Sequence, residues 1–271
     1  MAAEQTSGDP PVEAESLVAR ITAPVFERLD VFGTYVMLTG KTLMWLIRPP
    51  YRFGQLLLSM EFIGVQSIFI VALTGTFSGM VLALQTTNTL RQFGAEGVVG
   101  SVVAISLTRE ISPVFAALMV TARAGSAMAA ELGNMRVTEQ IDAIVTMGVS
   151  PIQYLLVPRL VATMLVAPLL CILYTCLGLA GSWLVAVEWL GVDPGVFVAN
   201  IQKNMVPHDF WMGEVKSIVF GFFIATISCS QGFVASGGAR GVGLATTRAV
   251  VQSAVAILIT NYIITSLMTD L

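Results

Sequence analysis

Charged residues are scarce in this chain of 271 residues, because Asp, Glu, Lys and Arg together make up only 11% of it. A soluble domain of this length would carry about 25%. Hydrophobic residues reach 55%, and the mean hydropathy is +0.81. This balance excludes an ordinary soluble domain and predicts an all-α integral membrane protein.

Histidine and cysteine are also few, with one and three copies. All three cysteines lie in apolar runs without a CxxC spacing, which predicts small buried side chains and neither a disulfide nor a zinc site. They are Cys171, Cys176 and Cys229. His208 stands next to Asp209 in a polar stretch, as expected of a solvated loop residue. We therefore expect no metal and no cofactor.

Catalytic motifs are missing as well. Residues 40–42 (GKT) resemble the end of a phosphate-binding loop, but Tyr35 stands where its first glycine should be and no strand precedes it. Residues 241–243 (GVG) lack the third glycine of a dinucleotide fingerprint, and Ser78 is not flanked as GxSxG. The sequence indicates neither an enzyme nor an ATPase, and we expect no nucleic-acid partner.

The chain divides into three parts. Residues 1–16 are acidic, contain Pro-Pro and lack the features of a signal peptide, which predicts a retained disordered tail. Residues 17–60 repeat apolar side chains every three or four positions with charges between them. This pattern is typical of helices in the membrane interface, and a soluble helical pair is the alternative. Residues 61–271 form the predicted membrane domain.

Five membrane spans are predicted in that domain, at residues 62–90, 97–122, 160–187, 217–239 and 249–269. The first would be about 43 Å long at 1.5 Å per residue, so it must tilt in or project from a hydrocarbon core of about 30 Å. A short amphipathic helix is predicted over residues 194–205, in the loop before the fourth span.

The Lys and Arg distribution predicts the orientation, since these residues favour cytoplasmic loops. With the N-terminus inside, most fall on the cytoplasmic side: Arg20, Arg28, Lys41, Arg48, Arg52, Arg123, Arg136, Arg159, Arg240 and Arg248. Arg91 and Lys203 fall outside, and Lys216 lies near the outer end of the fourth span. The odd number of spans then places the C-terminus outside.

Arg109 and Glu110 interrupt the second span. A charge there costs about 2.5–3.5 kcal/mol on insertion scales, so such residues usually face a cavity or another charge. Neighbours on a helix point about 100° apart, so these two do not pair well directly. Glu110 therefore needs water or a polar partner on another helix or subunit. An internal ion pair that fixes helix packing and a polar point in a substrate cavity both remain open.

Small residues recur at four-residue intervals in two places, a spacing that lets helices approach closely in lipid. One row is Gly75, Gly79 and Ala83, and the other is Ala122, Ser126 and Ala130. Packing within one chain and a homodimer seam are both compatible with this pattern.

The segment from about residue 126 to 148 is more than a turn between spans. Its helix-prone sequence carries Glu131, Arg136, Glu139 and Asp142. A connecting loop needs no such element, so we predict that a partner protein docks there.

Three stretches together resemble the MlaE (YrbE) family of ABC-transporter permeases. They are GTFSGMVLALQ at 75–85, LTREISPVFAALMVTARAGSAMAAELGNMRVTEQIDAIVTMGVSP at 107–151 and GARGVGLATTRAVVQSA at 238–254. Their order and spacing match the family from about Leu56 to the end of the chain.

The resemblance implies a homodimeric permease in the bacterial inner membrane, with five membrane helices, an N-terminal interfacial helix and no ATPase of its own. A cytoplasmic MlaF-like ATPase would dock on the segment between the second and third spans. A periplasmic MlaD-like MCE-domain protein would receive or deliver phospholipid, which would occupy a cavity between the two permease subunits.

The resemblance also assigns residues. A coupling helix at about 126–148 would include or adjoin Glu131, Arg136, Thr138, Glu139 and Asp142. The lipid cavity would lie near Arg109 and Glu110 and be lined by Leu82, Leu90 and Phe93. Arg91 and Gln92 make this last stretch more polar than the family pattern.

Two other classes compete with this interpretation. A secondary transporter or channel would need polar residues in several spans or an inverted repeat. Beyond Arg109, Glu110, Asn261 and scattered hydroxyl residues, the sequence contains neither. A structural membrane assembly protein would form the dimer but would not depend on Glu139.

Overall fold

A computed structural model of the chain describes Gly33 and residues 37–45 and 52–269. These residues form helices and no strands, which confirms the all-α class. Five helical runs in the described part are long and apolar enough to cross a membrane: Phe53–Arg91, Glu96–Val137, Ile152–Trp189, Pro207–Phe233 and Gly238–Met268. The predicted tail 1–16 and most of residues 17–60 lie outside the described residues.

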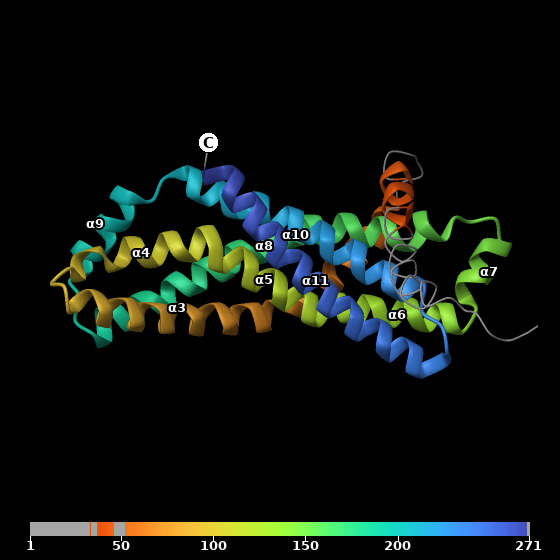
Figure 1. Cartoon of the computed structure of the whole chain (residues 1–271), viewed down its shortest axis with the longest axis horizontal. Coiled ribbons are helices and arrows are strands. Elements are labelled where there is room, and N and C mark those ends of the chain that lie inside the picture. The colour runs from red at the N-terminus through yellow and green to blue at the C-terminus, as the bar shows by residue number, and fades with distance from the viewer. Residues whose placement is uncertain (1–32, 34–36, 46–51, 270–271) are drawn as a thin grey trace, which may run out of the picture.

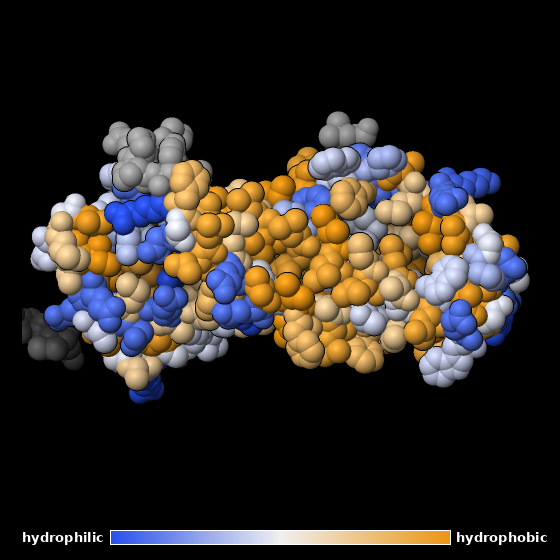
Figure 2. Space-filling model, turned by 180° about the vertical axis from the view of Figure 1, so that it is seen from behind, coloured by the Kyte–Doolittle hydropathy of each residue, from blue (hydrophilic) through white to orange (hydrophobic). Residues whose placement is uncertain are grey.

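The long helices run side by side along one axis of the molecule (Figure 1). Hydrophobic side chains gather around the middle of the surface in Figure 2, and hydrophilic ones gather towards both ends. Because about 20 apolar residues suffice to cross a bilayer, runs of 27 to 42 residues must project beyond it. The chain is an integral membrane protein with polar structure at both ends.

The first run is broken near its start. It consists of α2 (Phe53–Ile63), a short 3₁₀ turn η1 (Val65–Ser67) and α3 (Ile68–Arg91). The predicted start at Phe62 is therefore too late. Arg123 of the second run donates to the Phe62 carbonyl and to Gln66, and so bridges this break. Upstream, helical residues 37–45 lie across the long axis of the bundle in Figure 1.

The second run is one continuous helical stretch. It consists of six successive elements: η2 (Glu96–Val98), α4 (Val99–Ser106), the π-helical η3 (Leu107–Ile111), α5 (Ser112–Val120), the π-helical η4 (Thr121–Gly125) and α6 (Ser126–Val137). The helix continues past Ala122, the predicted end of the membrane span, into the predicted docking segment. The helix continues because Met128, Ala129 and Leu132 of α6 are buried, and α6 packs against α10 and α11.

The remaining spans are also longer than predicted or displaced. The third run joins η5 (Ile152–Leu156), α8 (Val157–Trp183) and η6 (Leu184–Trp189), and is followed by α10 (Pro207–Phe233) and α11 (Gly238–Thr269). The predicted fourth span, 217–239, ends too late, because α10 stops at Phe233, and the helix also begins before the predicted start of the span. Pro207 occupies the first turn of α10 and the Asp209 carboxylate accepts from the Val206 amide at 3.0 Å, so the helix begins in the polar stretch.

The short helix predicted over 194–205 is confirmed as α9 (Pro194–Asn204). Asp193 caps it by accepting a hydrogen bond from the Val196 amide at 2.8 Å. Asn200 donates to the Gly97 carbonyl at 2.8 Å, which ties α9 to the start of the second run. Phe197 is buried edge-on against Trp183, with ring centroids 5.5 Å apart. The helix therefore closes one end of the bundle.

Candidate functional site

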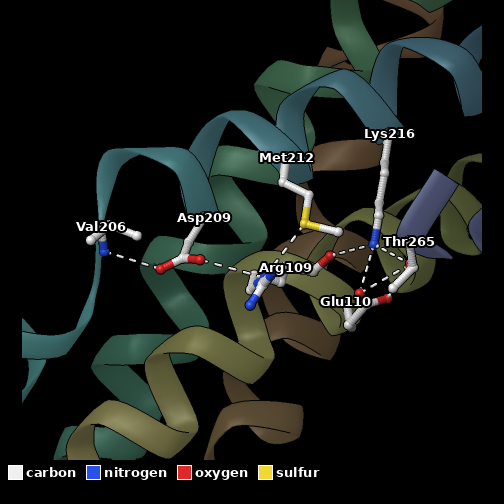
Figure 3. Close-up of polar contacts among 7 residues, drawn as sticks. All are labelled: Arg109, Glu110, Val206, Asp209, Met212, Lys216 and Thr265. Carbon is white, nitrogen blue, oxygen red and sulfur yellow. Dashed lines mark hydrogen bonds and ion pairs between the residues drawn. The ribbon is translucent and has the colours of Figure 1, made fainter. Parts of the chain in front are cut away.

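A cluster of charged residues lies inside the bundle where η3, α10 and α11 meet (Figure 3). The Lys216 ammonium nitrogen lies 2.7 Å from Glu110 Oε1, 2.9 Å from the Arg109 carbonyl and 2.8 Å from Thr265 Oγ1. Lys216 has no exposed side-chain surface, whereas the Glu110 side chain is 39% exposed. A buried ammonium is tolerated only when it is paired and hydrogen-bonded, as it is here.

Glu110 joins three helices through its two carboxylate oxygens. Besides Lys216 on α10, it accepts hydrogen bonds from Asn261 at 3.1 Å and from Thr265 at 3.1 Å, both on α11. Arg109, the adjacent residue, is not among these side-chain partners. Glu110 thus has its polar partners on other helices of the same chain.

Arg109 turns to a different part of α10. Its Nε lies 3.4 Å from Asp209 Oδ1 and 3.4 Å from the Met212 sulfur (Figure 3). Asp209 is 4% exposed and also caps α10 through the Val206 amide. The four charges form two pairs, Arg109–Asp209 and Glu110–Lys216, so the cluster carries no net charge when all four are ionised.

Sequence reasoning missed Lys216 and Asp209 as members of this cluster. Both were treated as residues at or beyond the outer end of the fourth span, although α10 contains them and both are buried. One signal in the sequence could have indicated the cluster. Arg109 and Glu110 need partners inside the membrane, and the stretch before the fourth span carries a charge of each sign at Asp209 and Lys216. His208, by contrast, is exposed as expected.

The residues expected to line a lipid cavity lie in different environments. Leu82 and Leu90 of α3 are partly buried and pack against the core. Phe93 is 76% exposed and lies in the turn after α3, not on the helix. The structure therefore brings Arg109 and Glu110 together with α10 and α11. The shared cavity role of these five residues stays a prediction.

The row Gly75, Gly79 and Ala83 is buried against α8 of the same chain. A Cβ atom added to Gly79 would lie 1.9 Å from the Gly178 carbonyl oxygen, and one added to Gly75 would lie 3.0 Å from the Tyr174 carbonyl oxygen. Of the two alternatives, the structure thus uses this row for packing within one chain. In the second row Ala122 is exposed, while Ser126 and Ala130 are half-buried.

The segment predicted to dock a partner is built from two helices and not one. α6 ends at Val137, and α7 (Gln140–Thr146) begins after a turn in which Glu139 has a left-handed backbone with φ of 60°. Such a backbone costs a non-glycine residue about 1–2 kcal/mol. The Glu139 side chain is exposed and has no ion pair with any described residue.

The other predicted docking residues have partners within the chain. Arg136 pairs with Asp142 at 2.6 Å across the α6–α7 turn, and the two side chains are 40% and 59% exposed. Thr138 donates to the Asn134 carbonyl at 2.8 Å. Glu131 pairs with Arg159 of α8 at 2.9 Å, so it faces the bundle. Within the part of the chain that the structure describes, Glu139 is the carboxylate at the tip of the segment without an ion pair.

Comparison with known proteins identifies a protein family with a matching sequence. Residues 56–267 match the family described as Permease MlaE. A probable ABC transporter permease protein of Rickettsia bellii is 42% identical over 235 residues, covering 87% of this chain and 91% of the relative.

Two further relatives extend the comparison. The intermembrane phospholipid transport system permease protein MlaE of Haemophilus influenzae is 38% identical over 218 residues, covering 80% of this chain and 84% of that protein. The chloroplastic protein TRIGALACTOSYLDIACYLGLYCEROL 1 of Arabidopsis thaliana is 35% identical over 230 residues, covering 85% of this chain and 66% of that one. With its five long helices and a family match over most of its length, this chain belongs to the MlaE permease family.

Proposed function

We propose that this chain is the membrane subunit of an ABC-type transporter that moves phospholipid between the inner membrane and a periplasmic MCE-domain carrier. The observation that carries the proposal is the match to the Permease MlaE family over residues 56–267, together with the Haemophilus influenzae relative named for intermembrane phospholipid transport. In this proposal two copies of the chain enclose the lipid, and a separate ATPase supplies the work. The N-terminus is cytoplasmic, and the C-terminus is periplasmic.

The geometry of the α6–α7 turn supports a docking role for it. The helical run that leads into this turn, Glu96–Val137, has 42 residues, whereas about 20 suffice to cross a bilayer. Glu139 stands at its tip in a strained backbone that a glycine would adopt without cost. A strained, exposed, unpaired charge is the kind of feature that clusters at functional contacts. In our proposal its carboxylate meets a basic group of the ATPase.

The charge cluster supports a role near the lipid path. Glu110 is partly exposed while its partner Lys216 is fully buried, so the carboxylate is the member of the pair that a lipid or water would reach. Rearrangement of this pair would change how α10 and α11 meet η3. We propose that the cluster couples lipid occupancy to helix packing.

Substitution of Glu139 by lysine tests the proposal. The reversed charge would repel the basic group of the ATPase, so we expect loss of ATP-driven lipid transfer in proteoliposomes. Insertion and dimer formation should stay normal. Glu188→Lys, the same charge reversal at an exposed residue of η6 outside the docking segment, is the matched control and should transport like the wild type.

The alternatives make different predictions for the same variant. A structural assembly protein, or a channel that needs no ATPase, would be unaffected by Glu139→Lys. Wild-type transfer by this variant would therefore remove the docking role from Glu139. Co-purification in mild detergent followed by mass spectrometry gives the complementary result: an ATPase, an MCE-domain protein and bound phospholipid should accompany the wild-type chain.

A further inference from the structure

A cavity with both polar and apolar lining lies between α2, α6 and the start of the third run, and none of its lining residues belongs to the charge cluster. It has a volume of about 260 Å³ and is lined by Gln55, Leu58, Ser59, Phe62, Ile63, Glu131, Tyr154, Leu155, Pro158 and Arg159. We call it the α2–α8 pocket. Half of these side chains are apolar and half are polar, so the pocket offers two chemically different surfaces.

The charged part of the pocket is Arg159 with Glu131. Arg159 Nη2 lies 2.9 Å from Glu131 Oε1, and the two side chains are 12% and 53% exposed. Arg159 Nη1 is buried and has no hydrogen-bond partner among the described residues. Buried donors in folded proteins almost always have an acceptor, so the orphaned nitrogen indicates a missing one. This nitrogen is not open to the pocket, so an anionic group would approach the guanidinium at the 12% of the side chain that stays exposed.

The polar edge of the pocket continues to the start of α2. The Tyr154 hydroxyl accepts a hydrogen bond from Gln55 Nε2 at 3.1 Å. The guanidinium of Arg52 lies 4.6 Å from the centre of the Tyr154 ring and adds a second cation there. Tyrosine and arginine in this arrangement are typical of the membrane–water boundary, where one side of a residue is apolar and the other is wet.

The opposite wall suits a hydrocarbon chain. The apolar part of the lining comes from Leu58, Phe62 and Ile63 of α2 and from Leu155 and Pro158 of the third run. Leu58 is 62% exposed, so the apolar wall continues onto the outer surface of the helix. A lipid tail would be held on such a wall by van der Waals packing, because lipid tails are as apolar as these side chains.

We propose that the α2–α8 pocket binds a zwitterionic phospholipid of the cytoplasmic leaflet. Its phosphate would lie towards Arg159 and Arg52, its ammonium towards Glu131, and the start of an acyl chain against the apolar wall. The paired opposite charges of Glu131 and Arg159 match a headgroup that carries both signs better than an anionic one. The assignment of the leaflet rests on the orientation in the proposed function.

A photo-crosslinking experiment on the full-length chain tests this proposal. The purified protein is reconstituted in nanodiscs that contain phosphatidylethanolamine with a photoactivatable acyl chain, and labelled peptides are mapped by mass spectrometry. We expect labels on α2 and on the segment 152–159. Ser59→Trp fills the pocket and should remove most of this labelling. Leu57→Trp is the matched control, because Leu57 is 66% exposed and does not line the pocket.

Each other outcome overturns the proposal. Unchanged labelling in Ser59→Trp, or equal loss in Leu57→Trp, would place the lipid elsewhere. Full competition by soluble glycerophosphoethanolamine would reduce the site to a headgroup or phosphate site. Cross-links from the pocket to the N-terminal segment would identify that segment as the occupant. If Ser59→Trp does not fold, Ser59→Leu takes its place.

The choice of headgroup is tested in the same system. A phosphatidylglycerol probe should label the pocket more weakly, and equal labelling would remove the ammonium contact with Glu131. The experiment contains no ATPase and measures no transport. Failure of lipid transfer by the wild type would therefore leave the pocket intact as a lipid site, and an unlabelled pocket would leave the transport function intact.

Discussion

At the level of single residues, Lys216 brings a fully buried ammonium group into the middle of the bundle. Its three oxygen partners come from η3 and α11, while its own backbone belongs to α10. A charge in such a place contributes little to net stability while its partner is present, but it is strongly destabilising once the partner is gone. The pair therefore specifies how these helices meet.

Substitution of Glu110 by glutamine should lower the free energy of unfolding by on the order of 3 kcal/mol, because the Lys216 ammonium loses its carboxylate partner among the described residues. Lys216→Met should cost less, since Glu110 remains partly exposed and can be hydrated. The double variant should cost less than the sum of the two. Chemical unfolding in detergent micelles measures all three, and additive losses would show that the pair is not coupled.

The same residues show where sequence reasoning stops. Arg109 and Glu110 were recognisable because two charges interrupt an apolar run. Lys216 and Asp209 were not, because a polar stretch before an apolar run looks the same whether it forms a loop or a buried helical turn. The partners are about 100 residues away, so only the fold reveals that their charges cancel.

At the level of helices, α3 and α8 pack almost backbone to backbone. Gly79 of α3 lies against Gly178 of α8, and Gly181 of α8 lies against the Thr76 carbonyl of α3. The spacing of small residues predicted close packing in lipid, but not which helix would supply the other surface. α8 supplies it within the same chain.

Gly79→Ala should destabilise the protein by about 1–3 kcal/mol, because the new methyl group would lie 1.9 Å from the Gly178 carbonyl oxygen and would force the helices apart. Gly243→Ala is the matched control, since a Cβ atom at that position of α11 meets nothing within 4 Å. It should be neutral or stabilising by up to about 1 kcal/mol. Equal thermal shifts for the two variants in detergent would contradict the packing argument.

The bounds of the helices were harder to predict than their existence. Hydropathy identified all five spans, because long apolar runs are unmistakable. It placed the end of the second span at Ala122, whereas α6 continues to Val137 with small and apolar side chains buried against α10 and α11. Hydropathy marks where the apolar run ends, whereas packing against α10 and α11 stabilises the helix beyond that point.

At the level of the whole molecule, the polar ends and apolar middle of the surface define how the chain crosses a bilayer (Figure 2). The end that contains α6 and α7 carries Arg136 and Arg159, while the opposite end carries α9 and the Arg91–Glu96 pair. The excess of Lys and Arg on the first side predicts that it is cytoplasmic.

Alkaline phosphatase fused after Leu271 should be active in bacterial cells, because five spans carry the C-terminus to the periplasm when the N-terminus is inside. A green fluorescent protein fused at the same position should stay dark when exported unfolded. The N-terminal fusions should show the reverse pattern. Active phosphatase at the N-terminus would invert the orientation and, with it, the leaflet assigned to the α2–α8 pocket.

The two ion pairs of the charge cluster also limit how the molecule can move. Arg109 and Glu110 are consecutive residues, yet they bind α10 at Asp209 and Lys216, two attachment points about 10 Å apart along its axis. One attachment would let α10 swivel or slide against η3, whereas two at different heights prevent both. While both ion pairs are intact, we expect η3 and α10 to move together as one rigid body. Any opening of the bundle that preserves them must then divide it along another helix boundary.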